Sequence, residues 1–186
     1  MKQLMTWPNL LTGMRLVMIP VMVVLLMREQ TTLIAFLAWF VFSLAAFTDW
    51  LDGYLARKFE CESVLGQLMD PLADKLLVTA ALIMLIPLGR IPAWVCLVII
   101  SREIFITGLR GLAASTGKVV AADNIGKIKS NFQYFGAGFL IFPLGLLPIP
   151  YQYGIGMTLV YISLALSLWS AAAYTYKLRD IFIETS

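Results

Sequence analysis

Long apolar segments, separated by short polar or proline-rich breaks, make up most of this chain and limit what it can fold into. A helix needs about 20 mainly apolar residues to cross roughly 30 Å of hydrocarbon. Hydrophobic residues are 60% of the 186 residues, well above the share in an ordinary soluble domain. The sequence therefore predicts an all-α membrane protein, a single membrane domain over residues 1–186 with six transmembrane helices near 8–27, 31–57, 66–88, 91–114, 125–147 and 152–177.

The orientation of this bundle is predicted from its lysines and arginines, because cytoplasmic loops carry an excess of them. Placing the N-terminus inside leaves only Arg28 and Arg90 on the outer side. The cytoplasmic side then receives Lys2, Arg57, Lys58, Lys118, Lys177 and Arg179. We expect both termini in the cytoplasm.

Ionisable residues inside the predicted spans all fall in the cytoplasmic half. They are Arg15, Asp49, Asp52, Asp70, Asp74, Lys75, Arg102, Glu103, Arg110, Lys127 and Lys129. A charge within a bilayer costs several kcal/mol unless it meets a partner or a wet cavity. Their shared depth predicts a polar cavity open to the cytoplasm.

The chain contains no histidine, which excludes Ser-His and Cys-His nucleophile pairs and zinc sites built on histidine. Carboxylates remain as the reactive groups. Asp49 and Asp52 are spaced to share one helix face, as are Asp70 and Asp74, and a short loop joins the two spans. Four carboxylates meeting at one point would hold two divalent cations, Mg²⁺ or Mn²⁺, against a pyrophosphate.

Small residues interleave with these aspartates: Gly53, Ala56 and Gly66. Close helix packing would explain them, since small residues are common at helix contacts in membranes. Room for a flat ligand group beside the helix would explain them equally well.

The order D-x2-D-G-x2-A-R-x8-G-x3-D-x3-D, met by residues 49–74, resembles the signature of the CDP-alcohol phosphotransferases, membrane enzymes of phospholipid synthesis. The run "PNLLTGMR" at 8–15 is similar to that family's entry into its first span. The runs "SREIFITGLR" and "IGKIKS" are similar to the branch that uses sn-glycerol 3-phosphate, although Ser130 stands where threonine is expected.

This resemblance implies transfer of the phosphatidyl group from CDP-diacylglycerol to sn-glycerol 3-phosphate, with release of CMP. It also implies a homodimer among membrane lipids in the bacterial inner (plasma) membrane, with the active site facing the cytoplasm and no nucleic-acid partner.

Roles follow for the residues near the signature. Asp49, Asp52 and Asp70 are expected to bind metal, and Asp74 to act as general base while touching the second metal. Gly53, Ala56 and Gly66 would line the cytidine slot. Arg57 would contact a donor phosphate or lipid headgroups. A donor-phosphate or nucleotide role is expected for the matching positions of the first span, Asn9, Thr12 and Arg15.

The acceptor carries its own phosphate and needs a second cationic pocket. Arg102, Arg110, Lys127 and Lys129 are the candidates, with Glu103 expected to support the pocket rather than bind metal. Lys127 and Lys129 point about 200° apart on an ideal helix, so at most one faces the phosphate squarely.

Other readings use the same carboxylates. Cardiolipin synthases and phosphatidylinositol phosphate synthases would pair this metal site with another acceptor. Intramembrane prenyltransferases carry their aspartates in two separate motifs, whereas here both pairs fall in one run of residues 49–74. A cation transporter would place charges near the bilayer centre and often shows an inverted repeat, and neither is evident.

Overall fold

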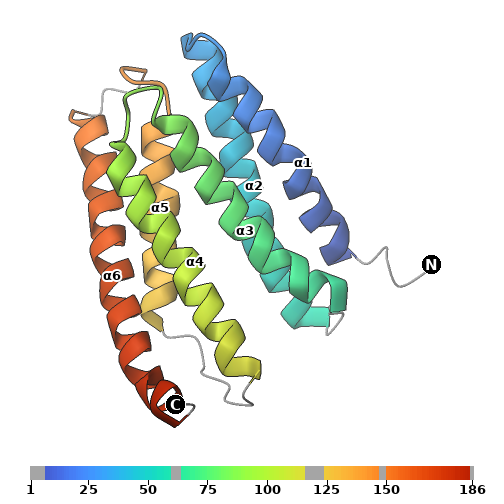
Figure 1. The fold of residues 1–186 in the computed structure, drawn as a ribbon. Coiled ribbons are helices and arrows are strands. Elements are labelled where there is room, and N and C mark those ends of the chain that lie inside the picture. The colour runs from blue at the N-terminus through green and yellow to red at the C-terminus, as the bar shows by residue number, and fades with distance from the viewer. Residues whose placement is uncertain (1–6, 60–63, 116–123, 147–149, 185–186) are drawn as a thin grey trace.

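Six antiparallel helices make up the described part of the chain, and no strand occurs there. The computed structural model describes the backbone of residues 7–59, 64–115, 124–146 and 150–184, and the side chains of 13–48, 72–115, 128–146 and 150–176. The helices are α1 (Trp7–Met27), α2 (Thr32–Phe59), α3 (Val64–Leu85), α4 (Ala93–Ser115), α5 (Asn124–Ile141) and α6 (Gln152–Glu184). Figure 1 shows them running up and down in turn, with α1, α2 and α3 on one side and α4, α5 and α6 on the other.

The fifth helix joins these two groups. It packs against α6 on one side and against α2 and α3 on the other, while α1 contacts α2 and α3, and α4 contacts α3 and α6. A continuous apolar core lies between the helices, with fully buried members such as Met22, Ala38, Leu77, Leu140 and Val160. The core therefore extends across both groups of helices.

Glycines allow α5 and α6 to approach closely. A Cβ at Gly136 of α5 would lie 2.8 Å from the Val160 Cγ2 atom and 3.2 Å from the Gly156 carbonyl oxygen of α6. A Cβ at Gly156 would lie 2.9 Å from the Leu140 side chain. Small residues at helix contacts are a common feature of membrane bundles, where packing drives association.

Two helices end earlier than predicted, and a proline follows each of these ends. The third helix ends at Leu85 rather than 88, and the fifth at Ile141 rather than 147. Pro87 and Pro143 follow these ends, and proline disfavours helical backbone at the residue before it. The last helix continues to Glu184, beyond the predicted end at 177.

Two side chains from other segments cap the end of α5. The Arg90 Nη1 atom donates to the carbonyl oxygens of Leu140 at 2.6 Å and Ile141 at 3.0 Å. Gln152 Nε2 donates to those of Phe139 and Phe142 at 3.1 and 3.2 Å. These bonds satisfy carbonyls that have no partner within the helix.

Within the described residues, one helical stretch, Gln152–Tyr176, has both the length and the apolar character needed to cross a membrane. The stretches Gly13–Met27 and Thr32–Thr48 are apolar but shorter.

Candidate active site

The alternation of the helices brings the signature residues and the cationic residues to the same end of the bundle. Asp49 and Asp52 lie in the last part of α2, and Asp70 and Asp74 in the first part of α3. Arg102 lies near the middle of α4, Arg110 lies closer to its C-terminal end, and Lys129 lies near the start of α5. In Figure 1 the C-terminal ends of α2 and α4 and the N-terminal ends of α3 and α5 lie toward the lower end of the bundle.

Many of the predicted donor-site side chains lie outside the described range. These are Asn9, Thr12, Asp49, Asp52, Gly53, Ala56, Arg57, Gly66 and Asp70. Their helices α2 and α3 pack against each other, which places the two halves of the signature on neighbouring backbones. Arg15 of α1 is described, and its side chain is completely buried.

The fourth carboxylate of the signature is held by a residue that the sequence did not single out. Tyr134 of α5 donates its hydroxyl hydrogen to the Asp74 Oδ1 atom. The tyrosine ring is itself packed against Phe42 of α2, with centroids 6.0 Å apart. The hydroxyl thus fixes one oxygen of a partly exposed carboxylate.

The oxygen donors fit a hard divalent cation, since Mg²⁺ and Mn²⁺ prefer carboxylates. Asp74 is the one signature carboxylate among the described side chains, and no group of three or more His, Cys, Asp or Glu side chains occurs within that range. Asp49, Asp52 and Asp70 are the further donors that the chain offers on the packed helices α2 and α3.

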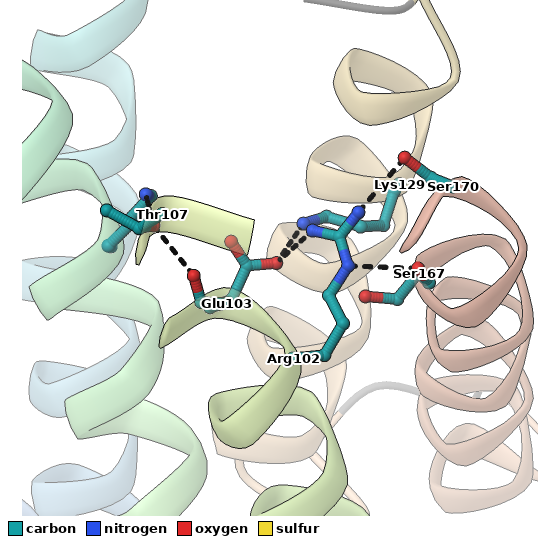
Figure 2. Close-up of polar contacts among 7 residues, drawn as sticks. Arg102, Glu103, Thr107, Lys129, Ser167 and Ser170 are labelled. Atoms are coloured by element: carbon teal, nitrogen blue, oxygen red, sulfur yellow. Dashed lines mark hydrogen bonds and ion pairs between the residues drawn. The ribbon is translucent and has the colours of Figure 1, made fainter. Parts of the chain in front are cut away.

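A buried ionic cluster lies between α4 and α5 (Figure 2). Glu103 Oε1 accepts a hydrogen bond from Arg102 Nη1 at 2.9 Å and another from Lys129 Nζ. The side chains of Arg102 and Lys129 are only 8% and 6% exposed, against 20% for Glu103. One carboxylate therefore joins two cations from different helices, and the three residues carry a net positive charge.

Arg102 is also fixed by α6. Its Nε atom donates to the Ser167 carbonyl oxygen at 2.9 Å, and its Nη2 atom donates to Ser170 Oγ at 3.0 Å. Each nitrogen of the guanidinium group thus has a partner in the fold. Neither serine belongs to a recognisable motif, and both are far from Arg102 in sequence.

A second hydrogen-bonded link runs from α3 to the same turn of α4. Lys75, next to Asp74, donates from Nζ to Thr107 Oγ1 at 2.7 Å. Thr107 in turn donates from Oγ1 to the Glu103 carbonyl oxygen at 2.7 Å. The cationic cluster and the Asp74 segment are therefore connected by side chains, not only by helix packing.

The remaining predicted acceptor residues lie apart from this cluster or outside the described range. Arg110 is exposed and lies over the Tyr174 ring of α6, with its guanidinium carbon 5.4 Å from the ring centroid. That geometry is a cation–π contact. The Lys127 side chain lies outside the described residues.

Comparison with known proteins gives a family match over most of the chain. Residues 5–169 match the family model described as CDP-alcohol phosphatidyltransferase. The chain is 38% identical over 182 residues to a Bacillus subtilis protein named CDP-diacylglycerol–glycerol-3-phosphate 3-phosphatidyltransferase, with 90% of this chain and 88% of the relative covered. A Rickettsia typhi protein of the same name is 34% identical over 175 residues, with 94% and 98% covered. A Mycobacterium tuberculosis protein named probable phosphatidylglycerophosphate synthase is 39% identical over 138 residues, with 73% and 66% covered.

Proposed function

The chain belongs to the CDP-alcohol phosphatidyltransferase family of membrane enzymes, and we propose that it transfers the phosphatidyl group of CDP-diacylglycerol to sn-glycerol 3-phosphate. The products are phosphatidylglycerophosphate and CMP. The names of relatives that cover most of both chains support this donor and this acceptor.

The observation that supports an acceptor with its own phosphate is the cationic cluster, and the names of the relatives favour sn-glycerol 3-phosphate among such acceptors. An acceptor with its own phosphate needs positive charge away from the metal site, and Arg102 and Lys129 offer it with little exposure to solvent. An arginine suits such a role because its planar group can bind two phosphate oxygens together. Arg110, which lies apart from the cluster over the Tyr174 ring, and Lys127 are further cations proposed to attract the acceptor phosphate.

Asp49, Asp52, Asp70 and Asp74 would hold two divalent cations, Mg²⁺ or Mn²⁺. When bound, the cations would neutralise charge on the diphosphate of the donor. The four aspartates themselves supply only oxygen ligands, which is the set such cations favour.

Asp74 is the proposed general base. It would take the proton of the acceptor hydroxyl as that oxygen attacks the β-phosphorus of the donor. The bond from this phosphorus to the oxygen of CMP breaks, and CMP leaves with the electron pair. Tyr134 would keep one Asp74 oxygen fixed, so that the other faces the reacting hydroxyl.

The donor would occupy the side of the site formed by α1, α2 and α3. Gly53, Ala56 and Gly66 leave space for the cytidine. Arg57 follows Ala56 directly in the sequence. The first span would contribute Asn9, Thr12 and the buried Arg15 to the same donor site. These cations and polar groups would bind the nucleotide and its phosphates.

The proposal includes a single membrane domain, residues 1–186, with six spans and both termini in the cytoplasm. Each helix presents a large apolar side chain that is at least half exposed, as a lipid-facing surface requires. Examples, one for each helix in order, are Val17, Leu33, Leu76, Leu97, Phe135 and Trp169. A bacterial inner membrane fits the bacterial relatives, and a homodimer rests on the family resemblance alone.

The test is CMP release by the purified protein given CDP-diacylglycerol and a panel of alcohols, with and without Mg²⁺ or Mn²⁺. sn-Glycerol 3-phosphate should support turnover, whereas inositol phosphate and phosphatidylglycerol should not. Preference for either of the latter would reassign the acceptor, and CMP release in the absence of any divalent cation would remove the metal from the proposal.

A further inference from the structure

Glu103 occupies the position that an incoming anion would seek. Its Oε1 atom bridges the Arg102 guanidinium and the Lys129 ammonium group. The Glu103 side chain, at 20% exposure, is more accessible than the side chains of either cation, which are 8% and 6% exposed. A phosphate entering the cluster therefore meets cations that are already bound to an anion of the protein itself.

The Glu103 carboxylate can leave the cluster without releasing Arg102 from its place. Arg102 stays anchored to α6 through Ser167 and Ser170, whatever Glu103 does. Lys129, by contrast, has Glu103 as its partner among the described side chains. Departure of the carboxylate would expose one fixed cation and one flexible cation, both ready for a new ligand.

Charge favours the exchange for one class of ligand. A carboxylate brings one negative charge to the two cations, whereas a phosphate monoester near pH 7 brings about 1.5 to 2, together with three strong acceptor oxygens. A doubly charged phosphate can therefore replace Glu103 with a net electrostatic gain. A singly charged anion has no such advantage over a carboxylate that is already tethered in place.

A further cation is connected to the backbone of Glu103 through a hydrogen-bonded side chain. Lys75 of α3 is bonded to Thr107, and Thr107 is bonded to the backbone of Glu103 itself. Lys75 is next to Asp74 in the sequence, and Asp74 is the proposed general base. Lys75 is thus a further cation linked to this turn of α4, in addition to the pair that the ligand would bind.

We propose that Glu103 is a resident anion, displaced when the phosphate of the acceptor binds Arg102 and Lys129. It holds the two cations together in the empty site and sets the affinity for the acceptor by competing with it. The identification of the ligand as an acceptor phosphate monoester rests on the proposed function.

The sign of one kinetic change tests this idea. Glu103→Gln keeps the shape and a hydrogen-bond acceptor but removes the competing charge. The KM for sn-glycerol 3-phosphate should fall by about tenfold, the value of a charged hydrogen bond at the low end of its range. The KM for CDP-diacylglycerol should stay within about twofold, because the donor is bound elsewhere.

If Glu103 only positioned the cations, the same substitution would raise the KM for the acceptor, and that result overturns the proposal. Glu103→Asp provides a second reading, since it keeps the charge but draws it back by one methylene. Its KM should fall between those of the wild type and Glu103→Gln. Glu29→Gln, the same charge change at an exposed position between α1 and α2, is the control and should alter neither KM.

A measurement without turnover separates this inference from the proposed function. Inorganic phosphate should raise the unfolding temperature of the full-length Glu103→Gln protein in detergent at a concentration about tenfold lower than for the wild type. Equal phosphate requirements would refute the resident anion even if the enzyme accepts sn-glycerol 3-phosphate. Failure of that acceptor with the phosphate shift intact would instead refute the proposed function.

Discussion

Tyr134→Phe tests how the proposed general base, Asp74, is held in position. The substitution removes the hydroxyl that donates to Asp74 Oδ1, but it keeps the ring that packs against Phe42 at a centroid distance of 6.0 Å. The change therefore removes the contacts of the hydroxyl, including the one to Asp74 Oδ1 and a longer one of 3.5 Å to the Asp74 carbonyl oxygen, and affects little apolar packing. Because Tyr134 lies on α5 and Asp74 on α3, the bond also fixes the carboxylate relative to the helix that carries Lys129.

The expected size follows from the type of bond. A hydrogen bond to a charged group is worth about 1.5 to 3 kcal/mol, and each 1.4 kcal/mol or so in the barrier is a factor of about ten in rate. Asp74 is partly exposed, so water can replace part of the lost bond. We expect kcat to fall about tenfold, with both KM values changed by less than about threefold.

The assay is steady-state CMP release with each substrate varied in turn. Tyr161→Phe is the matched control: it removes a hydroxyl from a ring that stacks on Trp94, at 6.2 Å between centroids, near the other end of the bundle. Its kcat should equal that of the wild type. An unchanged or increased kcat in Tyr134→Phe would show that the hydroxyl does not orient the base, and a rise in KM alone would move Tyr134 to substrate binding.

Three further perturbations test separate parts of the molecule. Asp74→Asn should abolish CMP release while the protein remains folded by circular dichroism, and near-normal turnover would refute the assignment of the base. Arg102→Ala should raise the KM for sn-glycerol 3-phosphate far more than that for CDP-diacylglycerol, and equal effects in the two titrations would remove Arg102 from the acceptor pocket. Gly136→Ala should destabilise the protein by about 1 to 3 kcal/mol in thermal unfolding, because the new Cβ would lie 2.8 Å from Val160. Gly111→Ala on α4, where a Cβ meets nothing within 4 Å, is its control.

The helical architecture could be predicted from hydropathy because each apolar run is about as long as the helix that it forms. Starts were predicted within about two residues, since turn and polar residues mark them. Ends were less certain: the fifth helix stops at Ile141 because of Pro143, although apolar residues continue beyond it. Apolar character alone did not distinguish the residues that follow Ile141 from residues in the helix.

The sequence predicted the two cations Arg102 and Lys129 and a supporting role for Glu103, and the structure brings these three side chains together. The two aspartate pairs, chosen from their helical spacing, stay a prediction. The distant partners of Arg102 and Asp74 could not be predicted. Tyr134, Ser167 and Ser170 lie 60, 65 and 68 residues from the groups that they bind, and no local pattern connects them. The choice between Lys127 and Lys129 likewise depends on helix rotation, and the structure buries Lys129 against Glu103.

The reaction is tested most directly by following the acceptor into the lipid. Purified full-length protein would receive CDP-diacylglycerol, Mg²⁺ and uniformly ¹³C-labelled sn-glycerol 3-phosphate, and both phases would be analysed by mass spectrometry. We predict labelled phosphatidylglycerophosphate in the lipid phase and an equal amount of CMP in the aqueous phase. CMP accompanied by unlabelled lipid, or label that stays entirely in the aqueous phase, would contradict transfer to this acceptor.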